Sequence, residues 1–122
     1  MNRAFVFDTY AILEIISGNK NYSPYLDSEI VINDFIFAEL CYNLIKEKGL
    51  ERSSLLIEKY SKFIMEISPE IIENAMLFRF DSRKKGVSMA DCIDYMHAKY
   101  LNIRFLTGDK EFAGIPNVEF VR

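Results

Sequence analysis

Phe5-Val6-Phe7-Asp8-Thr9, close to the start of the chain, is the stretch that decides the fold. A short apolar run that ends at an acidic residue is typical of a buried strand. A helical pattern begins directly afterwards, over residues 11–16. Asp8 is therefore expected at the carboxyl edge of a parallel sheet, where open α/β proteins bind their ligands. The alternative is that Asp8 or Thr9 only caps the helix, by accepting hydrogen bonds from its free N–H groups.

The composition indicates a single domain over residues 1–122. Half of the residues are hydrophobic, which predicts one packed core rather than disorder. The chain shows no signal-peptide pattern and no apolar stretch of membrane-spanning length. Cys41 and Cys92 both fall in helical patterns, as packed thiols do, so we expect a reducing, cytoplasmic setting. The net charge of −3 gives no global attraction to nucleic acid, so any such binding must be local.

Strand and helix patterns alternate along the rest of the chain. The predicted strands after the first are residues 30–32, 63–67, 105–106 and 118–121. For residues 63–67, an extension of the preceding helix is the alternative. The predicted helices after the first are residues 35–48, 50–61, 69–80 and 88–101, with a short one at 23–27. Because the helices are long enough for right-handed crossovers, the class is α/β with a mainly parallel sheet.

Two further acids lie on helices. Glu39 has mostly apolar or amphipathic helical neighbours, so it is expected at the rim of a cleft; an ordinary exposed glutamate is the alternative. Asp91 lies in the first turn of the helix 88–101, where closing a capping box with Ser88 is the alternative to a site role. His97, the only histidine, is interpreted as a packing residue. The predicted core side of this helix, opposite Asp91, is Met89, Ile93, Met96 and Tyr100.

Asp109 follows the strand 105–106 through Thr107-Gly108, where the glycine permits a tight turn. Asp109 is the fourth acid, after Asp8, Glu39 and Asp91, that is not expected to lie in the hydrophobic core. Carboxylates drawn together repel each other unless a cation joins them. Hard oxygen ligands suit Mg²⁺ or Mn²⁺, which can activate a water and neutralise charge on a phosphodiester. The sequence offers no competing zinc arrangement, nucleophilic triad or phosphate-binding glycine loop.

Four blocks of the sequence resemble those of the PIN domain family, and especially its small VapC-type toxins. The blocks are Phe5-Val6-Phe7-Asp8-Thr9, Phe37-Ala38-Glu39-Leu40, Ser88-Met89-Ala90-Asp91 with Ala98, and Phe105-Leu106-Thr107-Gly108-Asp109-Lys110-Glu111-Phe112. The last block is the most specific of the four. The resemblance implies a PIN-like α/β/α sandwich with a mainly parallel central sheet.

The same resemblance implies a metal-dependent ribonuclease, usually homodimeric and often inhibited by a small antitoxin protein. Asp8, Glu39, Asp91 and Asp109 match the metal-binding acids of the family, and Thr107 matches a position that helps to place the last acid or a water. Gly108 departs from the pattern, since many relatives have a basic residue there.

The resulting hypothesis is an endoribonuclease that uses Mg²⁺ or Mn²⁺ and activated water, as the toxin of a toxin–antitoxin pair. A housekeeping RNA-processing PIN nuclease and a catalytically silent RNA- or protein-binding module remain alternatives. A phosphatase with Asp8 as nucleophile is disfavoured, because Tyr10 stands where its second acid would be. The candidates for contact with the RNA backbone are Lys46, Arg83, Lys84, Lys85 and Lys110.

A homodimer is also expected from the hydrophobic residues. Ile12, Ile16, Tyr42 and Tyr60 exceed what the core of a small domain needs, so some of them are predicted to lie at an interface.

Overall fold

The computed structural model describes residues 3–82 and 86–122. Its four strands form one sheet, in which every neighbouring pair is parallel and the order is β2-β1-β3-β4. The strands are β1 (Ala4–Phe7), β2 (Glu29–Val31), β3 (Arg104–Thr107) and β4 (Val118–Phe120). The prediction of an α/β fold with a parallel sheet is therefore confirmed.

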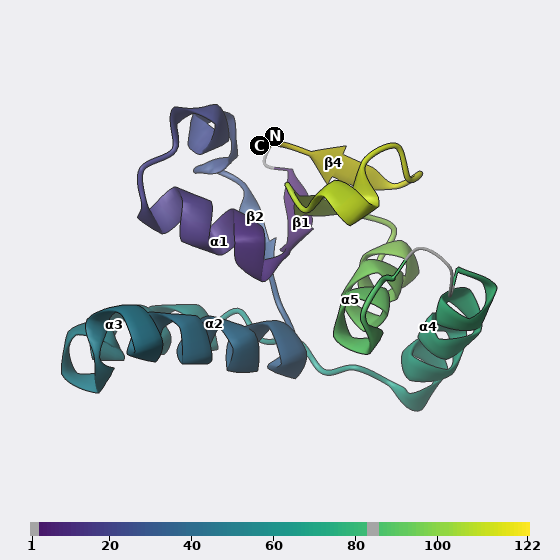
Figure 1. Cartoon of the computed structure of the whole chain (residues 1–122), viewed down its shortest axis with the longest axis horizontal. Coiled ribbons are helices and arrows are strands. Elements are labelled where there is room, and N and C mark those ends of the chain that lie inside the picture. The colour runs from purple at the N-terminus through teal and green to yellow at the C-terminus, as the bar shows by residue number, and fades with distance from the viewer. Residues whose placement is uncertain (1–2, 83–85) are drawn as a thin grey trace.

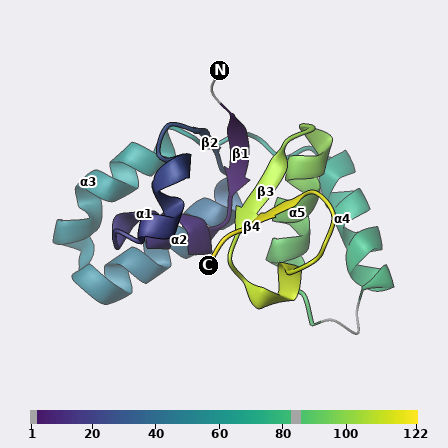
Figure 2. The ribbon, with the colours of Figure 1, turned by 90° about the horizontal axis from the view of Figure 1, so that it is seen from above.

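Helices cover both sides of this sheet. The helical segments are α1 (Thr9–Ile16), η1 (Lys20–Tyr25), α2 (Asp34–Lys48), α3 (Leu50–Ser61), α4 (Pro69–Asp81), α5 (Met89–Tyr100) and η3 (Lys110–Phe112). Figures 1 and 2 both show α1, α2 and α3 on one side of β1, and α4 with α5 on the other. No helix within the described residues is long and apolar enough to cross a membrane.

The central strand β1 is buried on both faces. Phe5, Val6 and Phe7 are all in the core, which explains why the sequence there is continuously apolar and does not alternate. Phe105 and Leu106 of the neighbouring β3 are fully buried as well. The carboxyl ends of these two central strands lie side by side, since Phe7 pairs with Leu106. The residues that follow each strand are thus brought together.

The predicted strand at residues 63–67 is wrong. Only Ile64 pairs, in a single parallel bridge with Ile32 beyond the end of β2. Two backbone hydrogen bonds make this bridge, from Ile32 to Phe63 and from Met65 to Ile32. The chain cannot continue as a strand, because Ser68 caps α4 three residues later.

The predicted core side of α5 is also partly wrong. Met89 and Tyr100 are 53% and 56% exposed. The reason is that α5 lies between the sheet and α4, so its buried surface is wider than a single stripe. Tyr95 contacts both partners, with its ring centroid 4.9 Å from that of Phe78 in α4 and 6.5 Å from that of Phe105 in β3. The buried residues of α5 are Cys92, Ile93, Asp94, Tyr95, His97 and Ala98.

The four hydrophobic residues predicted to supply an interface differ in their burial. Ile12 and Tyr60 are buried in the core, and Ile16 packs against it. Tyr42 is 65% exposed. Three of these four residues therefore pack inside the domain, because both faces of the sheet must be covered, and only Tyr42 of the four is exposed.

Candidate active site

The four acids singled out in the sequence line one pocket of about 280 Å³. Asp8 directly follows β1, and Asp109 lies two residues beyond β3. Asp91 comes from the first turn of α5, and Glu39 from the exposed face of α2. The full lining is Asp8, Thr9, Tyr10, Leu13, Glu39, Asn43, Ser88, Asp91 and Asp109. The pocket thus lies at the carboxyl edge of the sheet, where open α/β sheets bind their ligands.

Asp8 is both a helix cap and a pocket residue. Its Oδ1 accepts a hydrogen bond of 2.9 Å from the backbone N–H of Thr9 at the start of α1. Its Oδ2 accepts a hydrogen bond of 2.6 Å from the Thr107 hydroxyl. The carboxylate is only 5% exposed, so these two bonds fix its orientation from both sides.

Asp91 lies beside Ser88, which caps α5. The Ser88 hydroxyl accepts a hydrogen bond of 3.1 Å from the backbone N–H of Asp91. The Ser88 cap therefore uses the backbone N–H of Asp91, while the Asp91 carboxylate lines the pocket. In this first turn the positive end of the helix favours a negative charge.

The acids form two overlapping groups. Carboxylate oxygens of Asp8, Asp91 and Asp94 lie within 4.8 Å of one another, and so do those of Asp91, Asp109 and Glu111. Asp91 belongs to both groups. Glu39 belongs to neither and reaches the pocket from α2.

From the sequence, Asp91 is favoured over Asp94 as the metal ligand, and Glu111 is not predicted as a site residue. Asp94 lies three residues after Asp91, a spacing that places both on one helix face, but its buried position follows from the two-sided packing of α5. Glu111 lies two residues after Asp109, and its backbone N–H donates to the Asp109 carboxylate at 3.1 Å.

Burial and mutual repulsion make this group of acids unfavourable when ionised. Burial raises the pKa of Asp8 to about 7, and the Asp91 and Glu39 carboxylates add to the rise. Burial, with Asp109 and Glu39 adding to it, raises the pKa of Asp91 to about 6. Burial also raises the pKa of Asp94 well above its ordinary value.

A divalent cation fits this donor set. Among the described residues, both ion pairs involve Glu119, so none neutralises the pocket acids. Several carboxylate oxygens within ligand distance of each other are the arrangement that hard cations such as Mg²⁺ and Mn²⁺ prefer.

The family model described as PIN domain matches residues 5–118. This chain belongs to the PIN domain family. Its predicted resemblance to that family is therefore confirmed. None of the curated proteins compared with the sequence matches it.

Several solved structures share the fold of this PIN domain. A toxin–antitoxin complex from Klebsiella pneumoniae contains a chain with 24% identity and a TM-score of 0.74, with 94% of this chain and 95% of that chain covered. VapBC2 from Rickettsia felis, bound to a DNA fragment from its promoter, gives 21% identity, a TM-score of 0.76 and coverage of 98% and 99%. VapBC-1 from nontypeable Haemophilus influenzae gives 20% identity and a TM-score of 0.75, with 96% of each chain covered.

In this PIN domain Gly108 is needed for space rather than for a turn. Its backbone is not in the left-handed region, so the predicted conformational reason is wrong. A Cβ atom at this position would collide with the Tyr10 ring and the Val121 carbonyl oxygen. A basic side chain therefore has no room at residue 108. The guanidinium carbon of Arg122 lies 5.9 Å from the centroid of the Tyr10 ring, which places a positive charge against a pocket residue.

Two of the five basic residues predicted to contact RNA, Lys46 and Lys110, lie among the described residues. Lys46 is exposed on α2, seven residues after Glu39 and so on the same helix face. Lys110 is exposed and directly follows Asp109. Arg83, Lys84 and Lys85 lie outside the described residues.

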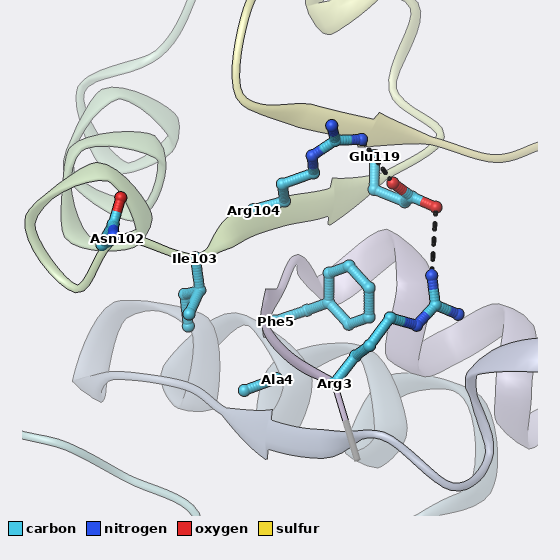
Figure 3. Close-up of a pocket in the computed structure, with 7 residues that line it drawn as sticks. All are labelled: Arg3, Ala4, Phe5, Asn102, Ile103, Arg104 and Glu119. Carbon is cyan, nitrogen blue, oxygen red and sulfur yellow. Dashed lines mark hydrogen bonds and ion pairs between the residues drawn. The ribbon is translucent and has the colours of Figure 1, made fainter. Parts of the chain in front are cut away.

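A larger hollow of about 450 Å³ lies at the opposite, amino-terminal edge of β1 and β3 (Figure 3). Glu119 is 3.0 Å from Arg104 and 4.0 Å from Arg3, and it also accepts a hydrogen bond of 2.6 Å from the Tyr25 hydroxyl. These contacts lower the pKa of Glu119, despite partial burial that would raise it. Because two arginines share the one carboxylate of Glu119, this hollow has an excess of positive charge, opposite in sign to the acid-lined pocket.

Proposed function

We propose that this PIN domain is a metal-dependent endoribonuclease that cleaves RNA phosphodiester bonds with an activated water, as the toxin of a toxin–antitoxin pair. The observation that supports this most is that Asp8, Glu39, Asp91 and Asp109 line one pocket although they are far apart in the sequence. These carboxylates have no ion-pair partner in the part of the chain that the structure describes, and such a group at the carboxyl edge of a parallel sheet suits a metal-dependent reaction.

Asp8, Asp91 and Asp109 would hold the Mg²⁺ or Mn²⁺, and Glu39 would complete the site from α2. The membership of Asp91 in two carboxylate groups suits either one ion or two. A bound ion supplies charge neutralisation at the phosphate and lowers the pKa of a water. The protein contributes orientation: Thr107 and the N–H of Thr9 hold Asp8, and Ser88 fixes the turn that carries Asp91.

The RNA backbone would approach from the open side of the pocket. Glu39, Asn43 and Lys46 lie at successive turns along one face of α2, so this face leads from the acids to a positive charge. At the other rim, Lys110 directly follows Asp109, and the Arg122 guanidinium lies over the ring of Tyr10. Since the net charge is −3, such local cations would have to supply the phosphate contacts.

The toxin role rests on the fold neighbours. The Klebsiella pneumoniae structure is a toxin–antitoxin complex, and the Rickettsia felis and Haemophilus influenzae structures are VapBC complexes. We therefore propose a small antitoxin protein as a partner and a homodimer as the working state. Exposed apolar side chains on α2 and α3, among them Tyr42 and Leu55, suit a protein partner on that side of the domain.

The test is cleavage of a mixed RNA pool by the purified protein. Mn²⁺ or Mg²⁺ should support cleavage, EDTA should abolish it, and Asp8→Asn should remain folded and inactive. Asp27→Asn, an exposed acid far from the pocket along the chain, is the matched control and should cleave normally. Cleavage in EDTA, or by Asp8→Asn at the wild-type rate, would contradict the metal mechanism. An inert wild-type protein would favour the binding-module alternative.

The toxin role has a separate test. Expression in bacterial cells should arrest growth, and Asp8→Asn should not. Co-expression of the short reading frame adjacent to the gene should restore growth. Normal growth with an active nuclease would point to an RNA-processing role with the same chemistry.

A further inference from the structure

Asn33 lies at the junction between the two helices that carry site acids. It is the N-cap of α2, which bears Glu39, and its side chain is fully buried. Its Oδ1 accepts hydrogen bonds of 3.0 Å from the N–H groups of both Phe35 and Ile36. This half of the amide group is therefore occupied by the first turn of α2.

The other half of the amide group reaches α5. Nδ2 lies 3.0 Å from Oδ1 of Asp94 and 3.3 Å from Nδ1 of His97. The amide cannot be turned around, because its NH₂ group would then face the two N–H donors of α2. Nδ2 must therefore donate to both groups, and Nδ1 of His97 must act as an acceptor. This assigns the neutral Nε2–H tautomer to His97.

One of the two acceptors, Asp94, lies beside the site acids. Asp94 is 3% exposed and lies one turn after Asp91, with carboxylate oxygens of the two residues and of Asp8 within 4.8 Å of one another. Among the hydrogen bonds made by described side chains, those of Asn33 are the ones that join α2 to α5. The spacing between Glu39 and Asp91 depends on how these two helices are held.

We infer that Asn33 is a positioning residue, which sets the relation between α2 and α5 and so the geometry of the carboxylates for a divalent cation. The inference rests on the proposed metal-dependent function. Mutation of the partners that orient metal-ligand side chains typically weakens metal binding by about ten- to hundredfold. A residue that only capped α2 would change stability and leave metal affinity unchanged.

Asn33→Ser separates the two roles. A serine hydroxyl still caps the helix, so most of the stability of α2 is kept. Its hydroxyl has a single hydrogen, so at least one of the two hydrogen bonds to Asp94 and His97 is lost and the connection to α5 is weakened. Ser68→Ala is the matched control, because it removes a cap from α4 that lies outside the pocket lining.

The measurement is thermal unfolding over a Mn²⁺ titration, with no RNA present. Asn33→Ser should raise the Mn²⁺ dissociation constant, obtained from how the melting temperature depends on Mn²⁺ concentration, by roughly ten- to hundredfold. Ser68→Ala should lower the melting temperature and leave that dissociation constant unchanged. If Asn33→Ser does not fold, Asn33→Thr, which also caps and fills more space, should give the same weakening.

The possible outcomes distinguish the positioning role of Asn33 from the proposed metal-dependent function. Wild-type affinity for Mn²⁺ in Asn33→Ser would overturn the positioning role and leave the metal site intact. An equal loss in Ser68→Ala would also overturn it, since general instability would then explain the effect. A wild-type protein that Mn²⁺ does not stabilise would overturn the metal-dependent function and the inference together.

Discussion

The Thr107 hydroxyl joins the first and the last acid of the pocket: it donates to Oδ2 of Asp8 at 2.6 Å. The same hydroxyl oxygen accepts a hydrogen bond of 3.0 Å from the backbone N–H of Asp109. Thr107 is fully buried, so neither bond competes with water. One side chain at the end of β3 thereby fixes a carboxylate after β1 and the turn that carries Asp109.

Thr107→Val should therefore weaken catalysis more than its small change in shape suggests. Valine keeps the volume and loses both hydrogen bonds, so Asp8 loses one of its two orienting contacts. We expect single-turnover RNA cleavage to fall by roughly ten- to hundredfold at a fixed Mn²⁺ concentration. Thr107→Ser keeps the hydroxyl and should stay close to the wild type; equal losses in both variants would point to packing rather than orientation.

The stability of the metal-free protein should depend on pH through Asp8. The pKa of Asp8 is about 7 in the folded protein, against an ordinary value of 3.8. The folded state therefore binds this proton more tightly, so the stabilisation is fully present below about pH 4 and is lost as the pH rises through about 7. Burial lowers the pKa of His97, so its contribution to stability changes with pH in the opposite direction. His97 is present in both the wild type and Asp8→Asn, so it does not affect their difference.

Asp8→Asn should consequently be more stable than the wild type in EDTA at pH 8, by roughly 1–3 kcal/mol, and the gain should shrink towards pH 5. Added Mn²⁺ should stabilise the wild type by mass action and the variant much less. Melting temperatures at the two pH values, with and without Mn²⁺, check both statements. Identical curves for the two proteins in all four conditions would contradict a shared carboxylate cluster.

The local patterns were sufficient for the four strands of the sheet and for placing Asp8 and Asp109 at one edge of it, but they also predicted a strand at 63–67, which is wrong. The family resemblance was needed to bring all four acids together. Asp8 was found from a buried strand followed at once by a helix, and that signal lies within a few residues. The fourth acid followed from the block around Thr107, which also resembles the family. Both inferences need only short-range information, because strand ends in a parallel sheet meet at one edge.

Long-range packing could not be predicted in the same way. Asn33 meets Asp94 and His97 across more than sixty residues, and α5 is covered on two sides, so its apolar stripe was misassigned. The need for Gly108 depends on Tyr10 and Val121, which no local pattern near residue 108 contains. Such contacts appear only when the elements are assembled.

Gly108→Ala should therefore damage the fold and the site together. A methyl group would meet the Tyr10 ring and the Val121 carbonyl, at a cost of about 1–3 kcal/mol in unfolding free energy. Since Tyr10 and Asp109 line the pocket, the Mn²⁺ affinity should fall as well. Gly114→Ala is the control: its φ of 79° makes alanine unfavourable by about 1 kcal/mol, yet nothing lies within 4 Å of the added carbon. Denaturant unfolding with a Mn²⁺ titration separates the two, and unchanged metal affinity in Gly108→Ala would contradict the coupling.

The last prediction separates Asp91 from Asp94. Carboxylate oxygens of both residues lie within 4.8 Å of Asp8, so distance alone does not decide which of them binds the metal. Asp91 lines the pocket and belongs to both carboxylate groups. Asp94 is 3% exposed behind it, with one oxygen held by Asn33. The Asp94→Asn variant can still accept that hydrogen bond, so the link between α2 and α5 should survive.

Asp91→Asn should therefore lose most metal-dependent cleavage at saturating RNA. Asp94→Asn should stay within about tenfold of the wild type, which corresponds to roughly 1.4 kcal/mol of activation free energy. Single-turnover cleavage over a Mn²⁺ titration measures both variants under the same conditions. If Asp94→Asn is inactive and Asp91→Asn cleaves normally, the deep carboxylate rather than the pocket-lining one holds the ion, and α5 presents a different turn to the metal than the one inferred from its cap at Ser88.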